Sequence, residues 1–188
     1  MQKEGINGGL KMLDFELAVL DFIQANFKTA FGDFIMPVIS ALGNGGIIWI
    51  CISLIFCLLP KYRKYGITMF IALILDALIC NIILKPLVAR TRPFAVNTSI
   101  NLLISAPKDY SFPSGHTAAS FSAAFSLFFG KNELWKPAVI LAALIAFSRL
   151  YLYVHYPTDV FTGIVIGVII GFLSNIIYRK AETLTCKI

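Results

Sequence analysis

Residues with the chemistry of a phosphate site occur in short segments of an otherwise apolar chain. They are Lys85, Arg92, the run Ser114–Gly115–His116, Arg149, His155 and Asp159. An arginine presents a planar fork of donors that matches two phosphate oxygens, and a lysine adds a point charge. Both histidines of the chain belong to this set. Their conjunction with these bases predicts an active site for a ligand that carries phosphate.

Ser114 and Gly115 stand at the start of a predicted helix, directly after Pro113. The first backbone N–H groups of a helix are unpaired and carry the positive end of its dipole. A glycine at this point lets an anion approach the backbone. We therefore expect Ser114 and Gly115 to bind phosphate oxygens. The alternative is that Ser114 is only a helix N-cap.

His155 and Asp159 are four residues apart, so the carboxylate can hold one nitrogen of the imidazole. The other nitrogen is then free to act as a nucleophile. His116 is predicted to serve in proton transfer. The alternative for Asp159 is an acid in the first turn of a helix, where the helix dipole favours negative charge.

The composition predicts that membrane-spanning helices position these residues. Of 188 residues, 58% are hydrophobic and 14% charged, against roughly 25% charged in a soluble domain, and the mean hydropathy is +0.80. These values exclude a soluble globule and a disordered chain. The net charge of +6 is divided between loops and helix ends, so no nucleic-acid partner is expected.

The expected fold is an all-α, polytopic membrane helix bundle of five to six transmembrane helices with an N-terminal amphipathic or partial helix. The segments that approach the roughly 20 apolar residues of a spanning helix are 65–88, 114–129, 134–154 and 159–178, with a shorter one at 46–59. One domain over 1–188 is predicted, with N-terminal helices in 1–44, a transmembrane core in 45–178 and a cytoplasmic tail in 179–188.

The N-terminal helices are predicted to differ from the spans. Apolar residues recur at helical spacing between Phe15 and Phe27, with charged and amide residues at the other positions. This pattern is typical of an amphipathic helix that lies in the membrane interface. If that helix crosses instead, six spans result. The segment 34–42 is predicted to be a partial or re-entrant helix, because the glycine-rich run 43–46 separates it from 46–59.

Basic residues at one set of helix ends predict the orientation in the membrane. They are Lys61, Arg63 and Lys64, then Lys131 and Lys136, then Arg179, Lys180 and Lys187. Lys and Arg near helix ends stay on the cytoplasmic side. The candidate site is then extracytoplasmic, since 89–113 and 155–158 join the opposite helix ends.

Three motifs occur in order between Lys85 and Asp159. Lys85 to Pro93 fits K-x6-R-P, Pro113 to His116 fits P-S-G-H, and Ser148 to Asp159 fits S-R-x5-H-x3-D. With these motifs the chain resembles the type 2 phosphatidic acid phosphatase (PAP2) superfamily, in its integral membrane lipid phosphatase branch. The resemblance covers the helical core and says little about the N-terminal helices.

The resemblance implies a role for each site residue. His155 would attack phosphorus and form a phosphohistidine, with Asp159 orienting the imidazole. His116 would protonate the leaving oxygen and then activate a water molecule. The nonbridging phosphate oxygens would be held by Lys85, Arg92, Arg149, Ser114 and the backbone N–H of Gly115.

The resemblance also implies no metal and no other cofactor, because cationic side chains stabilise the phosphate. The implied partner is an amphipathic lipid phosphate within the membrane; the oligomeric state is left open. We favour undecaprenyl diphosphate as the substrate, with phosphatidylglycerol phosphate or phosphatidic acid as alternatives of the same mechanism. The segment between Arg92 and Pro113 is short, so the site is expected to open sideways to lipid. The alternative to an enzyme is a protein that binds or translocates a lipid phosphate without turnover.

Other polar residues near the motifs carry expectations of their own. Asp76 lies nine residues before Lys85, half a turn out of phase at about 100° per residue, so the two should not share a helix face. We expect Asp76 to pair with a polar group of another helix and Asn81 to support Lys85. Arg90 and Lys108, each taken alone, are predicted to be interface anchors.

Overall fold

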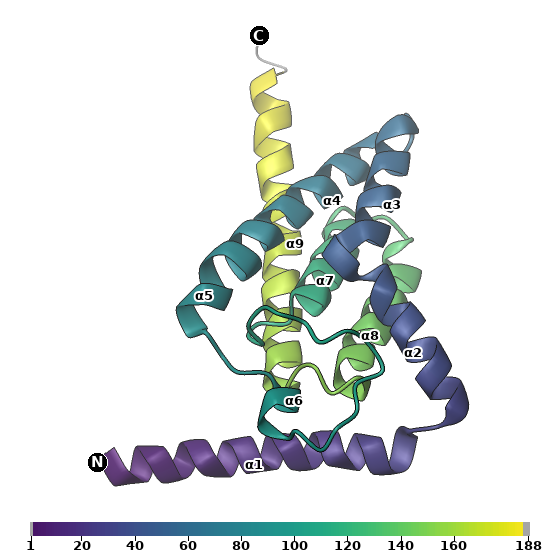
Figure 1. Ribbon diagram of the computed structural model, residues 1–188. Helices are drawn as coiled ribbons and strands as arrows, with labels where there is room; N and C mark the ends of the chain where they lie inside the picture. The colour runs from purple at the N-terminus through teal and green to yellow at the C-terminus, as the bar shows by residue number, and fades with distance from the viewer. Residues whose placement is uncertain (1, 186–188) are drawn as a thin grey trace.

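The computed structural model describes the backbone of residues 2–185 and the side chains of residues 11–184. In this part of the chain the regular elements are all helices, which confirms the predicted all-α membrane bundle (Figure 1). The elements are α1 (Gln2–Phe27), α2 (Ala30–Leu42), the 3-10 helix η1 (Asn44–Gly46), α3 (Ile47–Leu58), α4 (Arg63–Asp76), the π-helix η2 (Ala77–Leu84), α5 (Lys85–Val88), α6 (Pro93–Val96), α7 (Gly115–Phe129), α8 (Trp135–Tyr151) and α9 (Pro157–Thr185).

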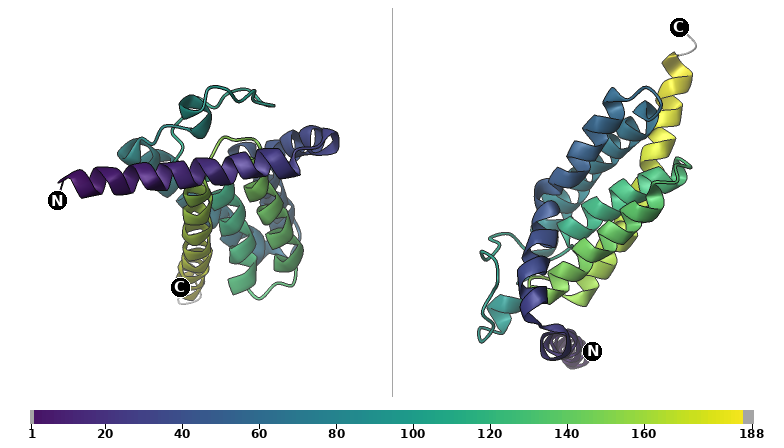
Figure 2. Two further views of the ribbon diagram at one scale, coloured as in Figure 1. Left: turned by 90° about the horizontal axis from the view of Figure 1, so that it is seen from below. Right: turned by 90° about the vertical axis from the view of Figure 1, so that its right-hand side faces the viewer.

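Helix α1 lies across one end of the bundle and does not run through it (Figures 1 and 2). Its buried residues include Glu16, Leu20 and Ile23, whereas Phe15 and Phe22 are exposed. Residues 16, 20 and 23 share one face at 3.6 residues per turn. α1 is therefore amphipathic, and the alternative in which it makes a sixth span is wrong.

Helices α2 and α3 form one passage that bends by 47°. The bend falls at η1, where Gly45 and Gly46 have φ values of +57° and +70°. Glycine adopts this left-handed conformation without steric cost, because it has no Cβ. Beyond the bend the chain continues toward the α3–α4 turn (Figure 1). The predicted break is confirmed, and 34–42 belongs to the first half of the bent helix pair.

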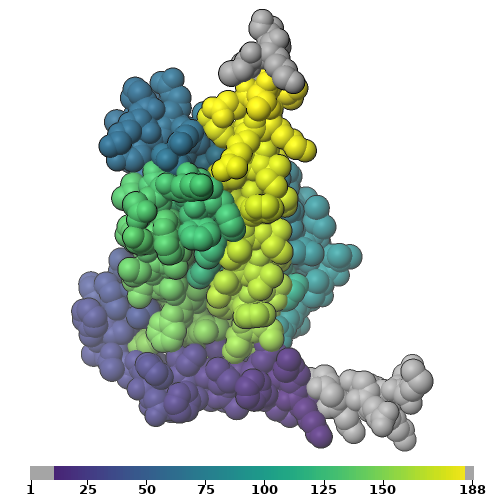
Figure 3. Space-filling view, turned by 180° about the vertical axis from the view of Figure 1, so that it is seen from behind, coloured from purple at the N-terminus to yellow at the C-terminus, as the bar shows by residue number. Residues whose placement is uncertain are grey.

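The other passages along the bundle are α4 with η2 and α5, then α7, α8 and α9 (Figure 2). Arg63–Val96 and Pro157–Leu184 are long and apolar enough to cross a membrane by themselves. α7 and α8 have 15 and 17 residues, or about 22 and 26 Å of helix, so they are short for a core of roughly 30 Å. α9 continues past the bundle at the end opposite α1 (Figure 3).

Three glycines allow α9 to pack closely on α7. A Cβ at Gly163, Gly167 or Gly171 would lie 2.9 Å or less from an atom of α7 or of its N-cap residue Ser114. The glycines are four residues apart and share one face, as in the small-residue interfaces of membrane helices. Because the start of α7 and the start of α9 both carry site residues, this close contact sets the distance between them.

The π-helix η2 corrects the expectation for Asp76. Its i→i+5 hydrogen bonds advance the chain by less than 100° per residue, as shown by the Lys85 N–H, which bonds to the carbonyl of Cys80. Asp76, Asn81 and Lys85 therefore line one cavity. The prediction that Asp76 and Lys85 lie on different faces is wrong, because it assumed an α-helix throughout.

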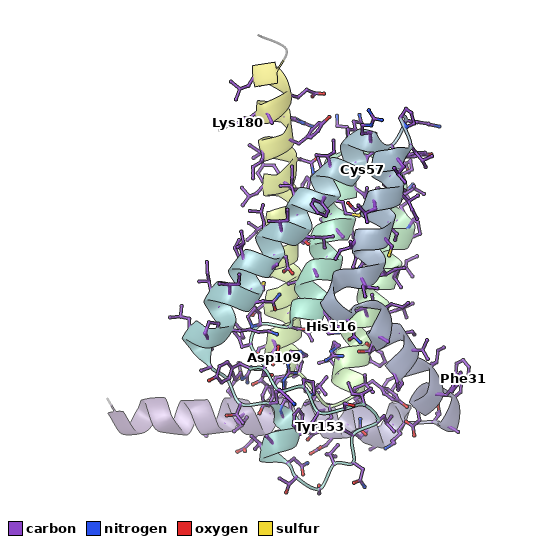
Figure 4. The ribbon with its side chains drawn as sticks, turned by 45° about the horizontal axis from the view of Figure 1, so that its top comes forward. Phe31, Cys57, Asp109, His116, Tyr153 and Lys180 are labelled. Carbon is purple, nitrogen blue, oxygen red and sulfur yellow. The ribbon has the colours of Figure 1, made fainter. Side chains whose placement is uncertain are left out.

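The two groups of basic residues lie at opposite ends of the bundle. Lys64 of α4, Gly130 after α7 and Arg179 of α9 line one shallow hollow at the end opposite α1. Lys180 lies at the same end, whereas His116 and Asp109 lie toward the end that α1 crosses (Figure 4). The predicted alternation of the loops is thus confirmed for the described residues. Lys187 lies outside them.

Candidate active site

A cavity of about 940 Å³ opens between α2, η2, α7 and the segment after α5. Most of the predicted site residues line it: Lys85, Arg92, Gly115, His116, Arg149 and His155. Their elements are separated by up to 70 residues of sequence, and the packing of α7 on α8 and α9 brings them together. Asp109 also lines this cavity, and Figure 4 shows it with His116 toward the end of the bundle that α1 crosses.

Asp109 joins two of the predicted phosphate ligands. Its carboxylate accepts hydrogen bonds from Lys85 Nζ and, at 2.7 Å, from Arg92 Nη2, while its carbonyl accepts from Arg92 Nε at 2.8 Å. These two cations hold the pKa of Asp109 at about 2, although burial opposes them. Asp109 was not among the site residues predicted from the sequence. Its place four residues before the P-S-G-H motif was the available signal.

Arg149 is 2% exposed and reaches the same cavity from α8. One of its terminal nitrogens donates to Ser40 Oγ of α2, and its Nε has no partner among the described residues. A buried donor without an acceptor costs free energy, so such a group is a candidate ligand for an anion. Ser40 was not expected from the sequence, because its contact depends on how α2 packs on α8.

His155 lies between α8 and α9 and is 1% exposed. Its Nδ1 is 3.5 Å from Asp159 Oδ2, just beyond a hydrogen bond, and its Nε2 is 3.3 Å from Arg92 Nη1. Burial, with the positive charges of Arg92 and Arg149, lowers the pKa of His155 to about 3 against the pull of Asp159. The imidazole is therefore neutral near pH 7, as a nucleophile must be.

Asp159 is fully buried and satisfies both carboxylate oxygens. Oδ2 accepts from Ser111 Oγ and, at 3.0 Å, from the Tyr156 N–H, and Oδ1 accepts from Arg90 Nη1 at 2.6 Å. Arg90 was predicted to be an interface anchor, and this is wrong. The chain turns at Ala89, where φ is +48°, just before Arg90. The sequence around Arg90 does not reveal this turn.

His116 stands in the first turn of α7, and its Nε2 is 2.9 Å from Asn44 Oδ1 of η1. A Cβ on Gly43 would lie 2.8 Å from the His116 ring. The broken span therefore brings a glycine and an amide against the predicted proton donor. This arrangement gives the break between α2 and α3 a role in the site.

Ser114 and Gly115 differ in their access to the cavity. A Cβ on Gly115 would lie 3.0 Å from Asn81 Oδ1 and 3.8 Å from Lys85 Nζ, at the cationic wall. Ser114 is buried outside the lining, and its Oγ pairs with Thr117 Oγ1 at 2.9 Å. It occupies the N-cap position of α7 without a side-chain capping bond. Its expected contact with phosphate stays a prediction.

Metal ligands do not cluster in the part of the chain that the structure describes. No group of three or more His, Cys, Asp or Glu side chains there is arranged to hold a metal ion. The acids near the site are instead paired with bases, Asp109 with Lys85 and Arg92, and Asp159 with Arg90.

Comparison with known proteins agrees with this geometry. The PAP2 superfamily matches residues 61–182. The undecaprenyl-diphosphatase of Sulfolobus acidocaldarius is 32% identical over 168 residues, which are 89% of this chain and 80% of that protein. The lipid A 4'-phosphatase of Bacteroides thetaiotaomicron is 31% identical, over 93% of this chain and 80% of that protein.

A solved structure shares the fold. The PAP2-type phosphatidylglycerolphosphate phosphatase of Bacillus subtilis superposes with a TM-score of 0.74 at 23% identity, over 90% of this chain and 87% of that one. The family match covers more than half of the chain and includes every motif residue from Lys85 to Asp159. The chain therefore belongs to the PAP2 superfamily and is one of its membrane lipid phosphatases.

Proposed function

We propose that this chain hydrolyses a lipid phosphate or diphosphate through a phosphohistidine on His155. The observation that carries the proposal is the cavity in which a buried, neutral His155 faces Lys85, Arg92 and Arg149. Cations placed where charge builds on a transferring phosphoryl group lower the barrier most. A protein that only binds phosphate has no need of the two histidines and the buried Asp159.

The reaction divides into two displacements at phosphorus. In the first, His155 Nε2 forms the bond to phosphorus while the bond to the leaving oxygen breaks, and His116 gives that oxygen its proton. In the second, His116 takes a proton from water, whose oxygen attacks phosphorus and breaks the phosphorus–nitrogen bond. Inorganic phosphate leaves, and both histidines return to their first form.

The contact between His155 and Asp159 is expected to change during this cycle. His155 becomes positively charged once it is phosphorylated, and a nearby carboxylate stabilises that charge. We expect the 3.5 Å separation between His155 Nδ1 and Asp159 Oδ2 to close into a hydrogen bond at that stage. Catalytic hydrogen bonds of this kind commonly tighten only when substrate is bound.

Asp109 competes for the same cations. Because its carboxylate pairs with Lys85 and Arg92, a substrate phosphate has to displace it. The Asp109 side chain is half exposed, so it can move away from Lys85 and Arg92 without opening the bundle. Asp109 thus lowers the affinity for any phosphate and keeps the two cations in place before substrate arrives.

The cavity also favours a substrate with a long apolar tail. Away from the bases it is lined by Ile50, Phe70, Leu73 and Ile74, which belong to α3 and α4. A tail can lie against these side chains and extend into the bilayer while the head group reaches His155. We propose undecaprenyl diphosphate as the substrate; phosphatidylglycerol phosphate and phosphatidic acid are the alternatives of the same mechanism.

We propose an extracytoplasmic site, since the bases at the opposite end of the bundle predict a cytoplasmic face there.

The test is phosphate release from a panel of lipid phosphates by the purified chain in detergent, with EDTA present. We expect turnover in EDTA, greatest with undecaprenyl diphosphate, and a loss of about 10⁴-fold or more in His155→Gln. Full activity of His155→Gln would refute the nucleophile. Substrate labelled with ³²P should leave acid-labile, base-stable label on the protein, whereas a binder without turnover would carry none.

A further inference from the structure

Glu16 is a buried acid on a helix that lies outside the bundle. It is 1% exposed, whereas Asp14 and Asp21 of the same helix are exposed. A carboxylate is stable in such a place only if it is paired and hydrogen-bonded. Helix α1 crosses the end of the bundle that carries the site (Figure 2), so the partners of Glu16 belong to that end.

Each oxygen of Glu16 has partners from another part of the chain. Oε2 accepts a hydrogen bond from Arg90 Nη2 and pairs with its charge. Oε1 accepts from the Thr158 hydroxyl and, at 3.2 Å, from the Thr158 N–H. That N–H belongs to the first turn of α9, where an acid is favoured by the helix dipole. Glu16 thus joins α1 to both Arg90 and the start of α9.

Arg90 carries the contact on to the catalytic pair. Its Nη1 donates to Asp159 Oδ1 at 2.6 Å and to Thr158 Oγ1 at 2.8 Å. Its guanidinium lies 3.9 Å from the centre of the Tyr156 ring. Glu16 therefore holds one side of the guanidinium and Asp159 the other, and Asp159 faces His155.

We propose that Glu16 is a positioning residue, which holds Arg90 so that Asp159 keeps its orientation toward His155. This inference rests on the proposed function. It also connects α1 with catalysis, because the helix that would lie in the membrane interface supplies the buried acid that holds Arg90. Phe15 and Phe22, 64% and 59% exposed and seven residues apart, provide the apolar face that the bilayer would hold.

The expected effect is on turnover and not on substrate affinity. Glu16 does not line the cavity, so its loss leaves the phosphate ligands in place. A small misplacement of a catalytic group can cost about 10²-fold in rate. We expect Glu16→Gln to lower kcat by about ten- to a hundredfold with KM within about twofold of its original value.

The test is a double-mutant cycle in the full-length chain, with farnesyl diphosphate in detergent micelles as the probe. The variants are Glu16→Gln, Arg90→Gln and the two together. If Glu16 acts through Arg90, the double variant loses no more kcat than Arg90→Gln alone, within about twofold. Losses that multiply would mean independent roles and would overturn the proposal.

Asp21→Asn is the matched control. Asp21 also ties α1 to the bundle, since it accepts a 2.7 Å hydrogen bond from the Tyr153 hydroxyl, but it contacts neither Arg90 nor Asp159. We expect this variant to lower Tm and to keep kcat within about twofold. An equal loss of kcat in Asp21→Asn would show that docking of α1 matters and that Glu16 has no particular role.

Two further outcomes separate the possibilities. If Glu16→Gln lowers Tm but leaves kcat unchanged, Glu16 only caps α9 and the proposal is wrong. If Glu16→Gln does not fold, Glu16→Asp keeps the charge but withdraws it by one methylene, and an unchanged kcat in that variant would overturn the proposal. If the chain without substitutions does not hydrolyse farnesyl diphosphate, the proposed function is refuted for this substrate, and the inference with it.

Discussion

The two ends of the bundle are both rich in basic residues, but they use them differently. At the site end, Arg92 and Arg149 are 5% and 2% exposed and have specific acceptors or an unmatched donor. At the opposite end, the pair Lys136–Glu133 is mostly exposed. A buried charge is costly unless a ligand or partner stabilises it, whereas an exposed one is hydrated. Burial therefore distinguishes the bases that we propose to bind a ligand from the bases that are predicted to orient the chain.

The strongest test of this comparison removes one arginine from each end. Arg149→Gln should lower kcat/KM by about 10²- to 10³-fold, because it removes a donor aimed at the transferring phosphoryl group. Arg179→Gln, at the exposed end of α9, should change kcat/KM by less than twofold. Steady-state kinetics on the best lipid phosphate measure both. Equal losses in the two variants would remove the distinction between the ends.

A second test uses the dependence of stability on pH. The pKa of His155 is lowered in the folded chain to about 3 from an ordinary 6.5, so its contribution is present above pH 6.5 and is lost as pH falls toward 3. The free energy of unfolding should fall by about 1.4 kcal/mol per pH unit in that range. His155→Gln should flatten this slope in Tm measured in detergent from pH 7 to 5. An unchanged slope would show that His155 is not the group that titrates.

A third test adds a methyl group at each end. In Gly115→Ala the methyl would meet Asn81 and Lys85 at the cavity wall, so kcat/KM should fall about tenfold with little change in Tm. In Gly130→Ala the methyl would meet Tyr65 and the carbonyl of Ser126, away from the cavity. That variant should lower Tm by a few degrees and keep kcat/KM. The opposite pattern would contradict the placement of the site.

The smallest effect should come from the acids paired with the bases. Asp109→Asn frees Lys85 and Arg92, so the inhibition constant of inorganic phosphate should fall about two- to fivefold. Glu133→Gln, which frees Lys136 at the other end, should leave inhibition unchanged. Competition assays with phosphate measure the difference. Weaker inhibition in Asp109→Asn would mean that Asp109 mainly holds Lys85 and Arg92 in position and does not mainly compete with phosphate for them.

Residues within one motif were the easiest to predict, because their spacing places them together whatever the rest of the chain does. His155 and Asp159 are four residues apart and face each other in the structure. Arg90 is two residues from a motif arginine, yet its partners Glu16 and Asp159 are 74 and 69 residues away. No local pattern reveals such a contact, and for this reason the sequence predicts only an interface anchor at Arg90.

Helix geometry limited the prediction in a second way. The rotation of about 100° per residue, which predicts Asp76 and Lys85 on different faces, holds for an α-helix. The intervening residues Ala77–Leu84 form a π-helix, and the hydrophobic pattern of a membrane helix does not distinguish the two. The break between α2 and α3, by contrast, was predicted because glycine marks it directly.

The amino-acid sequence by itself determined the membrane bundle, the opposite placement of two basic groups and the motif residues of the site. These depend on apolar length, on charge at helix ends and on local spacing, which are written along the chain. Only the tertiary structure decided that Asp109 pairs with the proposed phosphate ligands and that Glu16 reaches Asp159 through Arg90. Such pairs depend on helix crossings and loop paths, and these follow from the packing of the whole bundle.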